Sequence, residues 1–165
     1  GNVPRSCRGG VGFAALTDYG LDVDGFGSNG RIVHGGSNEV GTICAQETAH
    51  YATQIVKHGS ELALAGVAEG VDPGFNSITD GLLVRVDAGS GGLRGLSTFP
   101  AIDTSTGVRI GRVRLWGISA YDDRQYVVSG EVSDVQGVGN AFVTARLQPA
   151  DRMFASGFDV IYPQQ

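Results

Sequence analysis

A short acidic stretch near the start of the chain has the residue types and spacing of a calcium loop. Asp22 and Asp24 flank Val23, Gly25 follows directly, and Asn29 lies four residues further on. Carboxylates at alternate positions can converge on a hard cation where a glycine allows a sharp turn. The later bidentate glutamate of an EF-hand is missing, and the same residues suit a turn between strands, which is the favoured interpretation. No cofactor is predicted, and calcium at Asp22, Asp24 and Asn29 is the alternative.

A second group of carboxylates lies in predicted loops: Asp80, Asp122, Asp123 and Asp134. Two such groups about 5–10 Å apart could serve a glycoside hydrolase as its acid and base. Aspartates also form turns in β proteins by hydrogen bonding to the backbone. A secreted hydrolase that uses loop carboxylates is therefore one alternative function, and no catalytic residue is assigned.

An aromatic residue in a loop is a better candidate for recognition. Phe75 lies in the stretch 71–77, which has no packing periodicity, and loops of this kind often bind partners. The predicted binding residues of this loop and of a second loop, 133–140, are Asp72, Phe75, Asn76, Asp134 and Asn140. Trp116 stands two residues before Ile118, so in a regular strand it would share the face of Ile118 and belong to the core.

The elements that position these residues are predicted to be strands. Short apolar or alternating segments recur along the chain, each bounded by Gly, Asp, Asn, Ser or Pro, and 27 glycines suit strands joined by turns. The predicted strands are 12–16, 31–34, 41–45, 53–56, 62–68, 82–86, 93–99, 113–120, 126–132, 141–147 and 154–162. Residues 45–52 have a weak helical pattern and are expected to form a loop or a single turn. The fold class is all-β.

The second half of the chain repeats itself. Leu62–Gly66 aligns with Tyr126–Gly130, and Leu83–Val86 aligns with Thr144–Leu147. The repeat brings Arg85 and Arg146 to matching positions, where each is expected to be structural, paired with a carboxylate on a neighbouring strand. A period of roughly 60 residues indicates one supersecondary unit used repeatedly.

We predict a single domain, 1–165, of antiparallel four-stranded units. Its parts are a partial unit 10–35, a unit 45–100 and a unit 108–162. Such units are typical of β-propeller blades, and a β-sandwich or barrel is the alternative. The variable loops 69–80 and 133–140 should lie on one face of the assembly.

Residues 13–32 carry a family resemblance. Leu21-Asp22, Phe26-Gly27 and Asn29-Gly30-Arg31-Ile32, followed later by the Gly-ended strand Leu62–Gly66, resemble the delta-60 repeat. The resemblance implies a bacterial extracellular repeat that forms β-propeller blades. That family carries no established catalytic residues, so none transfers to this chain.

Charge and cysteine content restrict the setting. A net charge of −5 and a pI near 5.0 give no basic footprint, so nucleic acid is not predicted as a partner. No apolar run approaches the ~20 residues of a membrane-spanning helix. Cys7 and Cys44 are expected to form a disulfide, with two buried free thiols as the alternative. A disulfide favours a secreted, periplasmic or cell-surface protein, whose signal peptide would precede residue 1.

These features predict an extracellular binding or scaffolding domain that presents variable loops to a protein or glycan. Propellers close with four to eight blades, and two and a half units do not suffice. The second hypothesis is therefore a structural subunit or fragment, which completes a larger propeller or fibre with other chains or with copies of itself.

Overall fold

The computed structural model describes residues 10–34, 49–71, 76–103, 105–122, 125–135 and 139–147. Cys7, Cys44 and the predicted strands 41–45 and 154–162 lie outside these ranges, so the predicted disulfide and those strands stay predictions. The described residues form antiparallel strands without a helix, and no sheet closes on itself, which confirms the all-β class.

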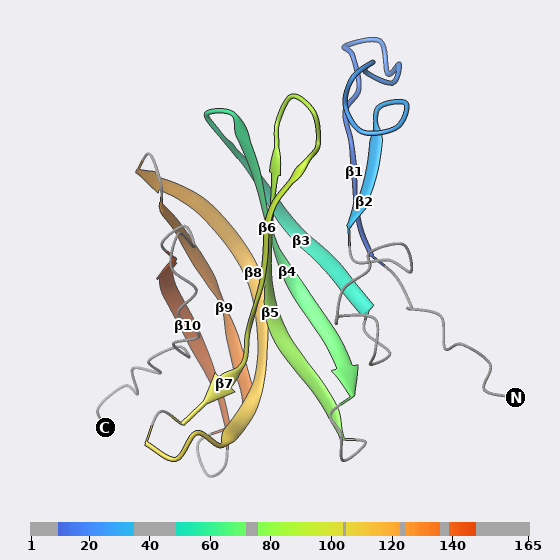
Figure 1. The fold of residues 1–165 in the computed structure, drawn as a ribbon. Coiled ribbons are helices and arrows are strands. Elements are labelled where there is room, and N and C mark those ends of the chain that lie inside the picture. Colours follow the sequence, from blue (N-terminus) through green and yellow to red (C-terminus); the bar gives the residue numbers. More distant parts are fainter. Residues whose placement is uncertain are drawn as a thin grey trace, which may run out of the picture.

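The strands are arranged in three layers (Figure 1). The hairpin consists of β1 (Val11–Ala14) and β2 (Arg31–His34). The first sheet consists of β3 (Ala49–His58), β4 (Glu61–Val71), β5 (Ser77–Asp87) and β6 (Leu93–Phe99). The second sheet consists of β7 (Ala101–Ile102), β8 (Arg109–Asp122), β9 (Gln125–Val135) and β10 (Gly139–Leu147). Every hydrogen-bonded neighbour within a sheet is also a neighbour in sequence.

Most of the observed strands extend beyond the predicted ones, but β1 ends two residues earlier than predicted and β7 was not predicted. Two predictions, 31–34 and 93–99, match the observed bounds. The stretch 45–52 was expected to form a loop or turn, yet residues 49–52 belong to β3. The backbone of these residues pairs with β4 whatever their side chains, so the weak helical pattern does not decide their structure.

One face of the first sheet packs on the hairpin. Leu64 of β4 and Val84 of β5 point toward it, and Phe13 and Phe26 of the hairpin region cover them. All four side chains are almost fully buried. Burial of a side chain of this size contributes about 1.5–3 kcal/mol, so this apolar contact holds the hairpin on the sheet.

The other face of the first sheet packs on the second sheet. Ala65 and Leu83 lie there against Leu115 and Val128. Gly81 lies close to β8, since a Cβ atom on this glycine would be only 2.9 Å from Leu115 Cγ. Small residues therefore let the two sheets approach, and β5 is buried on both faces.

The two sheets share an unusual local feature, a β-bulge opposite a glycine. In β3 the register shifts at Thr53, opposite Gly66; in β8 it shifts at Trp116, opposite Gly130. A Cβ atom on Gly66 would lie 2.0 Å from the carbonyl oxygen of Tyr51, and one on Gly130 would lie 2.0 Å from that of Arg114. A side chain is therefore excluded at both glycines.

Polar groups at the bulges join the sheets. Thr53 Oγ1 lies 3.0 Å from the Ala65 carbonyl oxygen and 2.7 Å from that of Leu115, in the other sheet. The backbone N–H of Ile118 donates to Gln54 Oε1 at 2.9 Å. Backbone groups that a bulge removes from the regular ladder thus bond across the interface.

The bulge corrects the prediction for Trp116. The residue was expected to share the buried face of Ile118, but the extra residue in β8 breaks the alternation. Trp116 is 51% exposed, whereas Ile118 is 5% exposed. Trp116 therefore lies outside the core.

The matched arginines hold similar positions with different partners. Arg85 forms an ion pair with Glu61 of the adjacent strand at 3.6 Å, as expected. Arg146 donates to Gln125 of its adjacent strand, an amide instead of the expected carboxylate, and its guanidinium lies 4.5 Å from the Tyr121 ring centroid.

Two further contacts tie the sheets together at opposite ends. Tyr126 of β9 donates from its hydroxyl to Glu61 Oε1 at 2.5 Å. Burial, and then the hydrogen bond to Glu61, raise the pKa of Tyr126 well above its ordinary value. At the other end, the Arg109 guanidinium of β8 binds the buried carboxylate of Asp80 through two hydrogen bonds.

Candidate binding surface

The predicted loops are shorter than expected. Residues 69–71 belong to β4 and 77–80 to β5, while 133–135 belong to β9 and 139–140 to β10. Polar residues ended the predicted strands early, but backbone pairing continues through them. The ends of β4 and β9 do lie at the same end of the sheets (Figure 1).

The predicted binding residues are therefore divided among different settings. Asp72 and Phe75 lie outside the described residues. Asn76 is exposed directly before β5, and Asn140 is exposed within β10. Asp134 belongs to β9, and its side chain lies outside the described part.

The residues of the predicted calcium loop lie in the turns between β1 and β2. Asp22 accepts a hydrogen bond from Arg31 Nε at 3.2 Å, so a cation partner already faces its carboxylate. Asn29 has a left-handed φ of 52°, and Asp24 is exposed. Within the described ranges, no group of three or more His, Cys, Asp or Glu could hold a metal ion.

Two of the loop carboxylates, Asp80 and Asp122, lie at opposite ends of β8. Asp80 contacts Arg109, the first residue of β8, whereas Asp122 is the last residue of that 14-residue strand. A strand of this length extends roughly 40 Å, far more than the spacing of a glycosidase pair. Asp123 lies outside the described residues.

Another aspartate organises a turn. Asp87 Oδ1 accepts hydrogen bonds from the backbone N–H groups of Ser90 at 2.9 Å and Gly89 at 3.0 Å, and its other oxygen accepts one from Arg94. The Ser90 N–H, then Arg94 and the Gly89 N–H, hold the pKa of Asp87 well below its ordinary value. This carboxylate is therefore a structural part of the β5–β6 turn.

The most distinctive exposed surface is the side of the second sheet that faces away from the first, which we term the outer face. Val128 and Val143 point inward, so by strand alternation their neighbours point outward. The outer face contains Arg114, Val127, Ser129, Glu131, Phe142, Thr144 and Arg146.

Three of these residues form a row across β8, β9 and β10. Arg114 Nη1 lies 3.1 Å from Glu131 Oε1, and Phe142 pairs with Glu131 on the next strand. The Phe142 side chain is 94% exposed. An ion pair beside a solvated aromatic ring offers both polar and stacking contacts to a partner.

At one end of the outer face, an arginine covers an exposed tyrosine. Arg146 lies over the Tyr121 ring and is itself exposed. Ser129 and Thr144, which pair between this stack and the Phe142 row, add hydroxyl groups. Tyrosine, arginine and phenylalanine are the residue types enriched where proteins bind partners.

The outer face was not predicted, because recognition residues were expected in loops. The signal was present in 141–147, where Val143, Ala145 and Leu147 form an apolar set with a period of two. Phe142 interrupts the polar set of that strand and must point away from the core.

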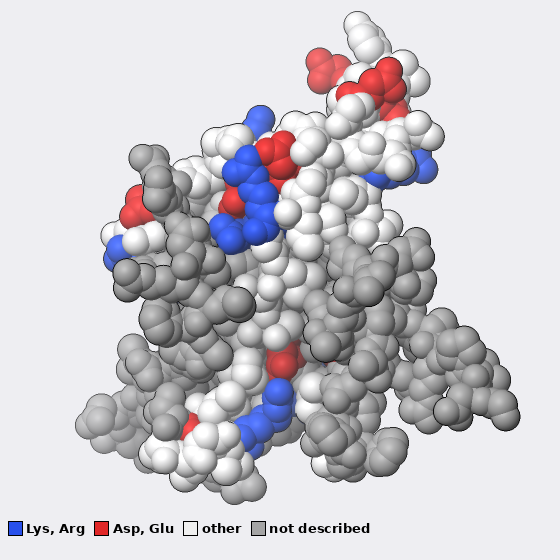
Figure 2. Space-filling model, viewed as in Figure 1, with Lys and Arg blue, Asp and Glu red and all other residues white. Residues whose placement is uncertain are grey.

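Charges on the molecule are mixed in sign. Figure 2 shows small groups that combine acidic and basic residues, separated by uncharged surface, on the face in view. Among the described residues in this view, no continuous basic patch of the kind that neutralises phosphates is seen.

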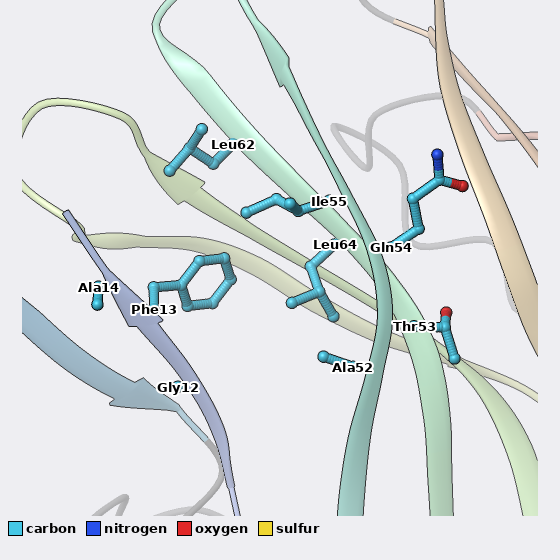
Figure 3. Close-up of a pocket in the computed structure, with 9 residues that line it drawn as sticks. All are labelled: Gly12, Phe13, Ala14, Ala52, Thr53, Gln54, Ile55, Leu62 and Leu64. Atoms are coloured by element: carbon cyan, nitrogen blue, oxygen red, sulfur yellow. The ribbon is translucent and has the colours of Figure 1, made fainter. Parts of the chain in front are cut away.

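A cleft lies between the hairpin and the first sheet. This cleft has a volume of about 280 Å³. Figure 3 shows Phe13 pointing from β1 toward Leu64 and Ile55, whereas Gln54 points away. Its lining consists of Gly12, Phe13, Ala14, Ala52, Thr53, Gln54, Ile55, Leu62 and Leu64.

Comparison with known proteins adds no relative: the chain matches no family model, no curated protein and no solved structure. The resemblance to the delta-60 repeat therefore stays a prediction. In the part of the chain that the structure describes, no helix is long and apolar enough to cross a membrane.

Proposed function

We propose that the protein is an extracellular binding or scaffolding β-repeat domain, whose stacked sheets hold the outer face toward a protein or glycan partner. One observation carries the proposal: positions that are buried and apolar in the first sheet are polar and more exposed in the second. The positions compared are Ala65, Val67 and Leu83 in the first sheet and Ser129, Glu131 and Thr144 in the second.

Matching features of the two sheets support the repeat on which this comparison rests. Each sheet has a bulge opposite a glycine, and each has an arginine on its third aligned strand that bonds to the first residue of the strand before it. In both sheets the same aligned positions face the preceding layer. These correspondences favour blades of one propeller arc, as the resemblance to the delta-60 repeat implies.

The chemistry of the outer face favours a partner that uses both stacking and hydrogen bonds. Phe142 and Tyr121 can stack on a sugar ring or on an apolar side chain. Arg114, Glu131 and the hydroxyls of Ser129 and Thr144 can bond to sugar hydroxyls or a peptide backbone. A rigid sheet holds these groups in place, so little conformational entropy is lost on binding.

The proposal is tested on arrays of bacterial and host glycans and of surface-protein peptides. The wild-type chain should bind a defined subset, and Phe142→Ser should weaken that binding at least tenfold. Tyr19→Ser is the matched control, because Tyr19 is 91% exposed but lies in the turn region of the hairpin. Equal binding by wild type and Phe142→Ser, or no binding by either, would contradict the proposal.

A further inference from the structure

The cleft beside the hairpin lies along an edge of β1 that is open among the described strands, where β1 pairs only with β2. The backbone N–H of Ala15 donates to the Gly30 carbonyl at 2.8 Å. Because bonded pairs alternate in an antiparallel ladder, Phe13 also bonds toward β2. Gly12 and Ala14 therefore direct their N–H and C=O groups to the opposite edge, into the cleft.

The floor of the cleft continues the apolar contact that holds the hairpin. Leu64 is buried beneath Phe13, and the same face of the sheet extends to Leu62 and to Ile55, which is 50% exposed. The interface between hairpin and sheet thus reaches past the edge of β1. It places an uncovered apolar surface next to backbone hydrogen-bonding groups.

The first sheet contains a strand in the position that corresponds to the open edge of β1. In β5, Gly81 and Leu83 face the second sheet. In the same way, Val11 and Phe13 of β1 face the first sheet. Beside β5, on the corresponding edge, lies β4, which pairs antiparallel with it. The alternate residues of β4 that face the next layer include Ala63 and Ala65, which are small and fully buried.

We propose that the cleft accepts a β-strand from another polypeptide, paired antiparallel with β1 and carrying small apolar side chains at alternate positions. The backbone of Gly12 and Ala14 supplies the hydrogen bonds, and Ile55 and Leu62, which lie beside the buried Leu64, receive the side chains. Backbone bonds give such strand addition its affinity, and the alternate side chains give it specificity. This proposal concerns the opposite end of the stack from the outer face and does not depend on it.

The probe is a synthetic peptide that copies residues 60–68, Ser-Glu-Leu-Ala-Leu-Ala-Gly-Val-Ala. Added to the full chain, it should slow amide hydrogen exchange at Gly12 and Ala14 at least tenfold, as measured by NMR. A control peptide with lysine at both positions that correspond to Ala63 and Ala65 should not bind. Failure of the first peptide to bind, or equal binding of both peptides, would overturn the proposal.

Two proline variants of the hairpin locate the binding edge. Ala14→Pro removes an N–H on the cleft edge and should weaken peptide binding at least tenfold, since the bonds to β2 do not use that group. Val33→Pro removes the equivalent group on the far edge of β2 and should leave binding unchanged. Equal losses in the two variants would overturn the assignment to β1.

Two further measurements keep the test decisive. If Ala14→Pro fails to fold by circular dichroism, Ile55→Lys should produce the same loss of binding, with Val33→Lys as its control. Phe142→Ser should bind the peptide as wild type does, which separates this proposal from the proposed function. The molar mass of the chain alone is also measured. If it is doubled and Ala14→Pro abolishes the doubling, a second copy of the chain occupies the cleft, which would overturn the proposed occupant.

Discussion

The first and second sheets are built alike but end differently. Both are antiparallel meanders with a bulge opposite a glycine, at Gly66 and Gly130. In the first sheet, both faces of β5 are buried between neighbouring layers. In the second sheet, one face packs on the first and the outer face exposes Phe142 among polar residues.

This difference separates the features that both sheets need in order to fold from the features that belong to the exposed outer face. The bulge and its glycine occur in both sheets, so they belong to the framework. Leu83 is apolar where the second sheet covers it, and Thr144 stands at the matching position on the outer face. Stacked repeats need a polar face on their terminal unit to stay in solution, and the outer face has that character.

The largest effect is expected where the sheets are alike. Gly66→Ala and Gly130→Ala each place a Cβ atom against a carbonyl oxygen, so each should lower the free energy of unfolding by about 3 kcal/mol or more. Urea denaturation measures both variants. Gly12→Ala is the control, because its Cβ atom would be no closer than 3.9 Å to the atoms around it. If only one of the two variants loses much unfolding free energy, the two bulges are not structurally equivalent.

Leu83 and Thr144 occupy matching positions, so each can be replaced by the residue of the other sheet. Leu83→Thr removes a buried apolar side chain and buries a hydroxyl, which should cost about 3 kcal/mol of unfolding free energy. Thr144→Leu on the outer face should change it by less than about 0.5 kcal/mol. Chemical denaturation of the pair gives both values. Similar losses in the two variants would show that the outer face is covered by another layer.

Ion pairs provide a third comparison. Asp80→Asn weakens a pair between the sheets in which the carboxylate is buried, so a loss of about 2 kcal/mol is expected. Glu131→Gln weakens the Arg114 pair within the outer face, where the carboxylate is more exposed than that of Asp80, and should cost less than about 1 kcal/mol. Thermal melting of both variants compares the two losses of stability. A larger loss in Glu131→Gln than in Asp80→Asn would contradict the prediction.

The smallest effect concerns pH. Because the pKa of Tyr126 is raised in the folded chain, its contribution to stability is complete below the ordinary tyrosine pKa of about 10 and is lost as the pH rises above it. Wild type should therefore lose stability above about pH 10, and Tyr126→Phe should lose less. Tyr121→Phe is the control in the same sheet, because Tyr121 is exposed and its hydroxyl is not buried between the sheets. Urea midpoints across this pH range check the result, and identical profiles for wild type and Tyr126→Phe would refute it.

Much of the fold was predictable because apolar alternation survives in the sequence. Leu82, Val84 and Val86 mark one face of β5, and their buried positions follow from a period of two. Strand ends were less predictable, because residues such as Glu69 and Thr79 are polar yet pair in the ladder between β4 and β5. The predicted loops were therefore too long.

The candidate surface was harder to predict. One extra residue in β8 turns Trp116 out of the core, and local sequence has no strong signal for a bulge. The bond between Tyr126 and Glu61 joins residues that are 65 positions apart, so only the packing of the sheets reveals it. The alternation of its strand shows that Phe142 points away from the core. Whether another layer covers it depends on the tertiary structure.

The order of the strands has a consequence for how the chain folds. Each four-stranded sheet pairs strands that follow one another, so its ladders close short loops and can form quickly. The contacts of Thr53 with Leu115 and of Gln54 with Ile118 span 62 and 64 residues and can form only when the finished sheets dock. Loss of the Thr53 hydroxyl should thus accelerate unfolding and leave the rate of folding nearly unchanged, so these two polar side chains govern how long the native stack persists.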